Sequence, residues 1–385
     1  MSPGREEPIP VMRPLLGAEE AQAAADAVTS GWVAQGPRVK AFEAAFAGVV
    51  ESREAVAVSS CTAGLHLALI ALGVGPGDEV IVPSLSFIAT ANAVRYVGAV
   101  PIFVDVDAQT LNISRATVEP AISPSTKVVM VVHQGGTPAD LDPLRALCDE
   151  RDIALLEDAA CAIGTTYKGR PVGAGSGLAA FSFHPRKVIT TGEGGMITTM
   201  SDSHAGRLRR LREHGMNVSA SERHHQSSVV VESYLEVGFN YRMTDIQAAV
   251  GLVQLARLGD IVARRRQLAA AYQERLSGIE GIRFAADPPW GESNFQSMWV
   301  ELPAESRVSR NAVLEYLLAE GISARRGIMA AHLEPPYAGC TVSLPVPLPV
   351  TERMTERSVI LPLFHELTHA QVDRITEVFG RAVRS

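Results

Sequence analysis

Residues 181–196 read FSFHPRKVITTGEGGM, a short apolar stretch followed by a polar turn that contains one lysine and several glycines. Lys187 is one of only four lysines in a chain with 35 lysines and arginines. Arginine stays protonated and is not nucleophilic, so lysine is the basic side chain that can react with a carbonyl group. The glycines allow the backbone to pass close to a bound molecule. The stretch therefore indicates a lysine that anchors a carbonyl cofactor, with a solvated surface lysine as the alternative.

The composition is typical of a folded protein with an acidic balance. Of the 385 residues, 46% are hydrophobic and 20% are charged, so the chain can bury a sizeable core in two or three domains. The net charge of −7 disfavours a nucleic-acid partner, because phosphates require a basic face. No stretch has the length and apolar character of a signal peptide or a membrane span, so we expect no membrane partner.

The cysteines and histidines do not have the spacing of metal ligands. Cys61, Cys148, Cys161 and Cys340 lie far apart, without a Cys-x-x-Cys pair. The adjacent pair at 224–225, His-His, also lacks ligand spacing and favours a mobile loop. We therefore expect free thiols, no metal and a cytoplasmic location.

Strand-like and helix-like segments alternate between residues 54 and 200. The strand-like segments are nearly continuous apolar runs at 56–58, 80–82, 101–104, 128–132, 153–156 and 179–183. Such runs are typical of a mostly parallel sheet that is covered by helices on both faces. Ligands of these sheets bind beyond the carboxyl ends of the strands. We therefore expect the polar turns after three of these strands to share one rim.

The pattern changes after residue 243. It predicts one long helix over 244–276, and then strands mixed with helices, at 297–302, 309–319, 358–361 and 368–383. We therefore expect a large domain over residues 1–250, which includes an N-terminal arm, and a smaller α+β domain over residues 251–385.

Three further segments contain groups that the same cofactor requires. Residues 59–64 (SSCTAG) lie between a strand and a helix, where free amides and the helix dipole suit a phosphate, or where Ser60 simply caps the helix. Asp158 ends a buried strand, where a carboxylate can keep a pyridine nitrogen protonated or can cap a helix. Residues 238–247 (GFNYRMTDIQ) precede the long helix, and capping by Thr244 is their default interpretation.

Taken together, these segments resemble the sugar aminotransferases of the DegT/DnrJ/EryC1/StrS family, which depend on pyridoxal 5'-phosphate (PLP). The resemblance covers nearly the whole chain and includes GWVAQGP at 31–37, GPGDEVIVPS at 75–84, FIATAN at 87–92 and PADLD at 138–142. It implies the α/β architecture of the PLP-dependent transferases of fold type I, which is aspartate aminotransferase-like. In this architecture a large domain has a mostly parallel seven-stranded sheet between helices, and a smaller C-terminal α+β domain follows. It also implies a homodimer with active sites at the subunit interface.

The resemblance assigns roles to individual residues. Lys187 corresponds to the lysine that binds PLP covalently and later moves a proton, and Asp158 to the partner of the pyridine nitrogen. Phe87 has the position of the aromatic ring that stacks on the cofactor. The implied phosphate contacts are Thr62, Ala63, Ser182 and, from the neighbouring subunit, Asn240. The implied substrate contacts are His184, Arg242, Arg325 and His332, with a structural ion pair as the alternative for Arg242.

The resemblance also implies a reaction. An amino group passes from L-glutamate to the cofactor, which becomes pyridoxamine phosphate (PMP), and then to a keto-sugar, in a ping-pong mechanism. The sequence KVITTGEGGM at 187–196 is similar to relatives that act on nucleotide-linked 4-keto-6-deoxysugars. A keto-cyclitol aminotransferase of an aminoglycoside pathway and a regulatory protein that holds PLP without turnover are the alternatives. Cys161 stands where many relatives have glutamine, and it either replaces a cofactor or substrate contact or serves packing alone.

Overall fold

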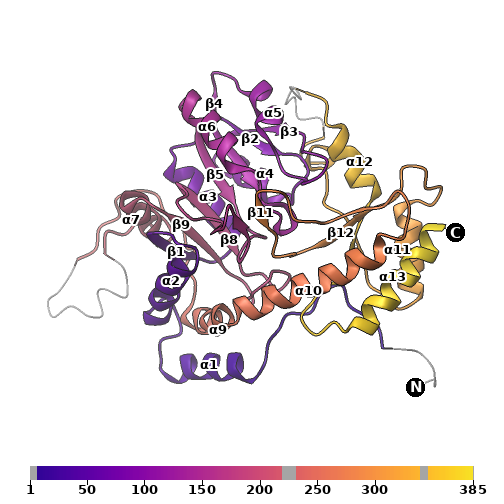
Figure 1. Ribbon diagram of the computed structural model, residues 1–385. Coiled ribbons are helices and arrows are strands. Elements are labelled where there is room, and N and C mark those ends of the chain that lie inside the picture. The colour runs from indigo at the N-terminus through magenta and orange to yellow at the C-terminus, as the bar shows by residue number, and fades with distance from the viewer. Residues whose placement is uncertain (1–6, 219–230, 339–345, 385) are drawn as a thin grey trace.

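The computed structural model describes residues 7–218, 231–338 and 346–384. His224, His225 and Cys340 lie outside these ranges. The described chain has a central seven-stranded sheet between helices and a second, four-stranded sheet near the C-terminus (Figure 1).

The central sheet is mostly parallel, as expected. Its order is β1-β9-β8-β5-β4-β2-β3, and β9 alone runs antiparallel to its neighbours. The strands are β1 (Glu54–Val58), β2 (Glu79–Pro83), β3 (Val100–Val104), β4 (Thr126–Val132), β5 (Ala154–Asp158), β8 (Leu178–Ser182) and β9 (Gly195–Thr199). Because β1, β5 and β8 run in the same direction, their polar ends meet at one edge of the sheet.

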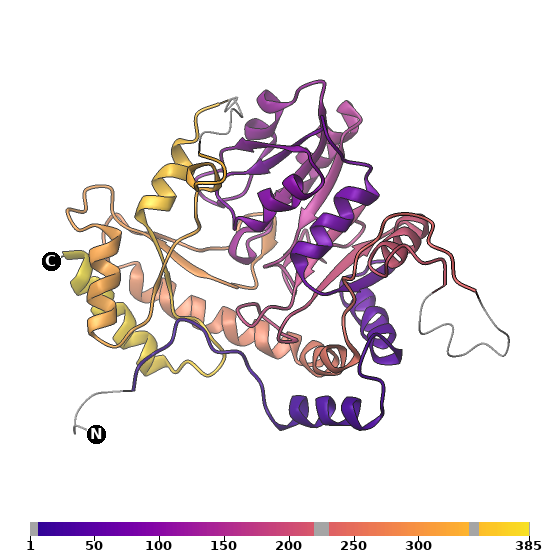
Figure 2. The ribbon, with the colours of Figure 1, turned by 180° about the vertical axis from the view of Figure 1, so that it is seen from behind.

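Helices cover both faces of this sheet because alternate apolar side chains point to opposite sides (Figures 1 and 2). In β8, Leu178 and Ala180 join one apolar core, whereas Ala179 and Phe181 join another. The covering helices include α2 (Pro37–Val49), α3 (Cys61–Ala71), α4 (Ala89–Tyr96), α6 (Leu141–Arg151) and α7 (Asp202–Leu211). The shorter elements are α5 (Arg115–Val118), β6 (Thr166–Tyr167) and β7 (Arg170–Pro171), and β6 pairs with β7.

The seventh strand, β9, is the one that the apolar pattern did not indicate. It begins inside the glycine-rich turn and consists of Gly195 followed by MITT, so it lacks an uninterrupted apolar run. A Cβ atom at Gly195 would lie 2.5 Å from the carbonyl carbon of Ser60. Glycine is therefore required where β9 passes the turn that leads into α3.

The four-stranded sheet is antiparallel and contains β10 (Arg283–Phe284), β12 (Met298–Glu301), β14 (Ser358–Leu361) and β13 (Arg325–Arg326). Helices α11 (Arg310–Ala319), α12 (Pro349–Arg357) and α13 (His369–Arg384) accompany it, while β11 (Gly291–Glu292) pairs with β6. The N-terminal arm reaches this part of the chain, because Ile9 forms a bridge with Ile322 and is fully buried. The domain boundary at residue 250 stays a prediction.

The prediction of one long helix over 244–276 is wrong in one respect, because the structure has two helices there. Helices α9 (Asp245–Ala256) and α10 (Leu258–Leu276) meet at an angle of 59°. The break falls at Arg257, whose guanidinium binds Glu19 at 2.7 Å and Glu20 at 2.9 Å, both in α1 (Ala18–Thr29). No single helix in the described ranges is long and apolar enough to cross a membrane, although this bent pair meets the length and composition criteria jointly.

Candidate active site

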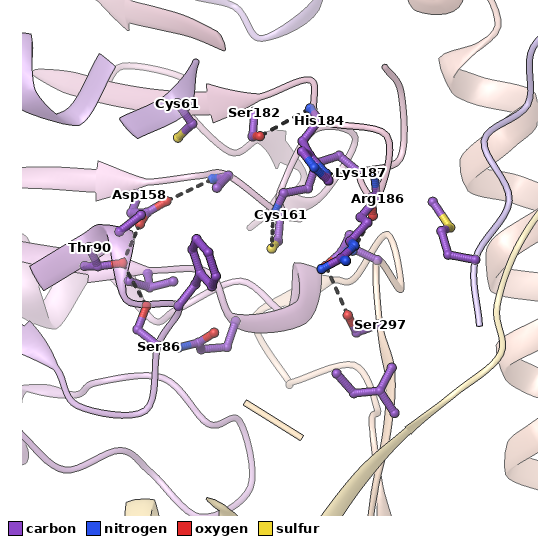
Figure 3. Close-up of a pocket in the computed structure, with 18 of the residues that line it drawn as sticks. Cys61, Ser86, Thr90, Asp158, Cys161, Ser182, His184, Arg186, Lys187 and Ser297 are labelled. Carbon is purple, nitrogen blue, oxygen red and sulfur yellow. Dashed lines mark hydrogen bonds between the residues drawn. The ribbon is translucent and has the colours of Figure 1, made fainter. Parts of the chain in front are cut away.

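A cavity of about 340 Å³ opens at the carboxyl ends of β1, β5 and β8 (Figure 3). One side, which we call the sheet wall, is formed by Thr62, Asp158, Cys161, Ser182 and Lys187. The opposite side, which we call the C-terminal wall, is formed by Gln296, Ser297, Arg325, Ile360, Leu361 and Leu363, with Val11 and Met12 of the N-terminal arm beside it. The structure therefore brings together most of the residues that the sequence indicated.

Lys187 lies in the turn that follows β8, and its ammonium group donates a hydrogen bond to Sγ of Cys161 at 3.1 Å. Burial by itself lowers the pKa of this lysine, but the contacts with Cys161 and the charge of Asp158 outweigh burial and raise the pKa. Lys187 is thus half-buried, with its amine facing a cavity, and is not a solvated surface lysine.

Cys161 is the contact partner of Lys187, so the sulfur does more than fill space. It follows β5 by three residues, and its backbone carbonyl accepts a hydrogen bond from Nδ2 of Asn294 at 2.8 Å. Sequence reasoning left its role open because a thiol is a weak hydrogen-bonding group, whereas the folded chain places it against the one lysine of the cavity.

Asp158 ends β5 and is almost fully buried, with 4% of its surface exposed. Its Oδ2 accepts a hydrogen bond from Oγ1 of Thr90 at 2.9 Å, and its Oδ1 accepts one from the amide of Ala160 at 3.1 Å. Thr90 is in turn 2.8 Å from the hydroxyl of Ser86, which also lines the cavity (Figure 3). Burial raises the pKa of Asp158 above its usual value, although these hydrogen bonds partly oppose the shift.

The turn before α3 presents a helix N-terminus to the cavity. Ser60 caps the helix, because its hydroxyl accepts a hydrogen bond from the amide of Ala63 at 3.1 Å. The capping alternative is therefore confirmed, and the amide of Ala63 is occupied by it. The amides of Cys61 and Thr62, in the first turn, have no intrahelical acceptor, and both residues line the cavity together with Ser182. The positive end of the helix dipole and nearby hydroxyl groups therefore face the end of the cavity that would take a phosphate.

Phe87 and His184 lie at the rim. The ring of Phe87 is 65% exposed although it lines the cavity, so a flat bound group would have an aromatic surface to cover it. His184 is 3.9 Å from Glu193, and burial followed by the nearby charges of Arg186, Lys187 and Arg325 lowers its pKa despite this carboxylate.

Four of the predicted contacts are not among the residues that line the cavity of this single chain: Ala63, Asn240, Arg242 and His332. Asn240 is exposed and forms a bridge with Glu213, and Arg242 is 3.8 Å from the same Glu213. The structural ion pair considered for Arg242 is therefore present. His332 is turned towards Ser84, whose hydroxyl is 2.6 Å from its Nδ1, so its contact is with a buried side chain.

Sequence reasoning missed the residues that hold the C-terminal wall. Arg265 of α10 is buried and donates to the carbonyl oxygens of Phe295 at 3.0 Å and Gln296 at 2.8 Å. Gln296 then donates to the carbonyl oxygen of Arg186 at 2.8 Å. Arg265 belongs to the run RRR at 264–266, which is indistinguishable in sequence from a solvated helix face. Only the fold shows that the middle arginine points inwards.

The donor set fits the cofactor that the resemblance implies. An amine, a buried carboxylate, a helix N-terminus with hydroxyl groups and an exposed aromatic ring surround one cavity, and PLP requires each of them for its aldehyde, ring nitrogen, phosphate and ring face. This combination defines the class: a PLP-dependent transferase of fold type I.

Comparison with known proteins specifies the family. Residues 14–379 match the DegT/DnrJ/EryC1/StrS aminotransferase family. The chain is 35% identical to the aminotransferase TlmJ from Streptoalloteichus hindustanus, with a TM-score of 0.89 over 98% of this chain and 99% of that one. Spr1654 from Streptococcus pneumoniae in its PMP form has a TM-score of 0.90 at 29% identity, over 98% and 99% of the two chains. DesI, solved with its TDP-sugar product, has a TM-score of 0.88 at 32% identity, over 98% and 94%.

The chain belongs to the DegT/DnrJ/EryC1/StrS aminotransferase family, and it is a PLP-dependent aminotransferase. The expected family, fold class and cofactor are thereby confirmed. The roles of the individual site residues stay predictions.

Proposed function

We propose that this enzyme transfers the amino group of L-glutamate to a nucleotide-linked keto-sugar, specifically a 4-keto-6-deoxysugar, in two half-reactions. The observation that carries the proposal is the single cavity that joins Lys187 and Asp158 to an open, partly apolar wall. PLP supplies an electron sink when it is bound.

The residues of the sheet wall have separate roles. Lys187 would anchor the cofactor and, once released by the donor, move a proton at its Nζ. Asp158, held by Thr90 and Ala160, would keep the ring nitrogen protonated. The helix N-terminus at Thr62 and the hydroxyl of Ser182 would hold the phosphate, while Phe87 would cover the ring.

The other wall supports a deoxysugar as acceptor. Val11, Met12, Ile360, Leu361 and Leu363 give the cavity an apolar side that suits a methyl group better than a hydroxymethyl group. DesI, a relative with essentially the same fold, was solved with a TDP-sugar product. A keto-cyclitol is more uniformly polar and would leave this apolar side in contact with hydroxyl groups, so we place it second.

We also propose that the enzyme is a cytoplasmic homodimer whose sites are shared between subunits. Asn240, assigned to the phosphate, lies outside the cavity of its own chain, in a segment where Tyr234, Leu235 and Val237 are 62%, 63% and 86% exposed. Such an exposed apolar segment is typical of an interface. The thiols of Cys61, Cys148 and Cys161 are free, which supports a reducing compartment.

The first experiment is the visible spectrum of the protein purified with PLP, before and after L-glutamate, followed by a panel of keto-sugars and keto-cyclitols. We expect L-glutamate to convert the PLP form into the PMP form, and a TDP-linked 4-keto-6-deoxysugar to restore it. Binding of PLP without a response to any amino donor would favour the regulatory alternative, and restoration by a cyclitol alone would favour the second acceptor class.

The shared site has its own test. An inactive Lys187→Ala chain and an Asn240→Ala chain are mixed, reversibly dissociated and reassociated. We expect activity to reappear in the mixture, because one of the two sites in a mixed dimer then has both residues intact. A mixture as inactive as its components would contradict a shared site.

A further inference from the structure

Two arginines from distant parts of the chain line the same cavity. Arg186 immediately precedes Lys187 in the turn after β8, and Arg325 lies in β13, where it pairs with Ile360 of β14. Figure 3 shows Arg186 beside Lys187 and apart from Asp158 and Thr90. Within the described residues, neither guanidinium group forms an ion pair or a side-chain hydrogen bond.

The charge of Arg186 acts on Arg325. The pKa of Arg325 is lowered first by burial and then by the charge of Arg186. The two carboxylates that line the cavity form no ion pair with these arginines: Asp158 accepts from Thr90 and Ala160, and Glu193 lies 3.9 Å from His184. Two like charges that face one cavity without a counter-ion repel each other, and a bound anion removes this repulsion.

The position of Arg186 indicates which anion is bound. Its Cα is one peptide unit, about 3.8 Å, from that of the reactive lysine. In an amino acid the amine and the carboxylate share one carbon atom, so a carboxylate must lie close to the reacting nitrogen. In a nucleotide-linked sugar the phosphates are separated from the keto carbon by the sugar ring. The planar fork of arginine also matches a carboxylate with two parallel hydrogen bonds.

We propose that Arg186 and Arg325 form a carboxylate subsite for the amino donor, and that the pair selects an amino dicarboxylate over an amino acid with a neutral side chain. This inference rests on the proposed aminotransferase reaction and adds to it the residues that choose the donor. Two guanidinium groups match the two carboxylates of L-glutamate, whereas L-glutamine or L-alanine leaves one of them without a partner.

The test measures binding of maleate, a dicarboxylate without an amino group, to the PLP-loaded enzyme by calorimetry. Arg186→Gln and Arg325→Gln are each expected to weaken maleate binding by about 10-fold or more, the loss of one charge-assisted contact. Arg326→Gln is the matched control, because this neighbour is exposed and paired with Glu334 at 3.3 Å; it should bind maleate like the wild type.

A second probe, thymidine diphosphate, distinguishes the source of the anion. We expect its affinity to be unchanged in both variants. If the variants bind thymidine diphosphate more weakly but bind maleate as the wild type does, the arginines bind the nucleotide and the proposal is overturned. Arg325→Lys, which keeps the charge but not the fork, should give an intermediate maleate affinity, and normal PLP absorbance in each variant shows that it has folded.

The donor preference completes the test. The rate at which L-glutamate, L-glutamine and L-alanine convert the wild type to the PMP form is compared with that of Arg325→Gln. We expect the preference for glutamate over glutamine to fall by about 10-fold in the variant. An unchanged preference would overturn the inference but leave the aminotransferase reaction intact, whereas no conversion of the wild type by any donor would contradict the proposed function itself.

Discussion

The two walls of the cavity are built in different ways. The sheet wall carries its reactive groups on strand ends and on the turns that follow them, so each side chain is positioned by the hydrogen bonds of a buried sheet. The C-terminal wall depends on a loop at residues 293–297 and two short strand segments, held by buried polar side chains such as Arg265 and Asn294. The reacting groups thus lie at the ends of buried strands, and the substrate-facing groups lie on a loop and on short strands.

The largest expected effect concerns the sheet wall. Lys187→Ala should reduce amino transfer by about 10³-fold or more, because it removes both the cofactor anchor and the group that moves the proton. Turnover with L-glutamate and a keto-sugar, together with the visible spectrum, measures this. Lys168→Ala is the matched control: Lys168 is exposed and paired with Asp142 at 2.6 Å, and its loss should leave turnover intact. Transfer by Lys187→Ala at a normal rate would refute the role.

Asp158→Asn comes next, with an expected loss of about 100-fold, because an amide cannot keep the ring nitrogen protonated. Thr90→Val removes one hydrogen bond to the same carboxylate. It should lower the rate less, since the amide of Ala160 still donates to Asp158. Single-turnover rates with L-glutamate separate the two variants. Equal losses would contradict this expectation and show that the amide of Ala160 alone does not keep Asp158 effective.

The sheet wall was also the wall that could be predicted from sequence. Apolar runs that end in polar turns indicate strand ends, and strand ends of one direction meet at one rim, so Asp158, Ser182 and Lys187 could be placed together before any coordinates. Strand β9 was not predicted, because its glycine and threonine residues interrupt the apolar pattern. In the C-terminal wall, the resemblance indicated Arg325 alone. Arg265, which holds this wall, could not be predicted, because it differs from its two arginine neighbours only by the direction in which it points.

Arg265 offers a way to disturb the C-terminal wall without touching the reactive groups. Arg265→Met should lower the free energy of unfolding by about 2–4 kcal/mol, since it leaves the buried carbonyl oxygens of Phe295 and Gln296 without donors. Arg381→Met, at an exposed i,i+4 pair with Glu377, should cost about 0.5 kcal/mol or less.

Denaturant-induced unfolding measures the free energy of unfolding of both arginine variants. Burial lowers the pKa of Arg265 to about 10, so the side chain remains charged at pH 7 and the comparison holds at neutral pH. An effect of Arg265→Met as small as that of Arg381→Met would show that solvent can replace the lost donors and that the loop is not held by this side chain.

The smallest expected effect concerns Cys161 in the sheet wall. The sulfur of Cys161 accepts a hydrogen bond from the ammonium group of Lys187 and helps to raise the pKa of the lysine against the opposing effect of burial. Cys161→Ala removes this contact, so the pKa of Lys187 should fall and the neutral amine should form at lower pH. The rate at which the cofactor-free protein captures PLP requires that neutral amine, and its pH profile should shift towards lower pH, with a change of less than about 10-fold at pH 7. Cys148→Ala, on α6 and outside the cavity, should leave the profile unchanged. An unchanged pH profile in Cys161→Ala would show that the thiol does not stabilise the charge of the lysine.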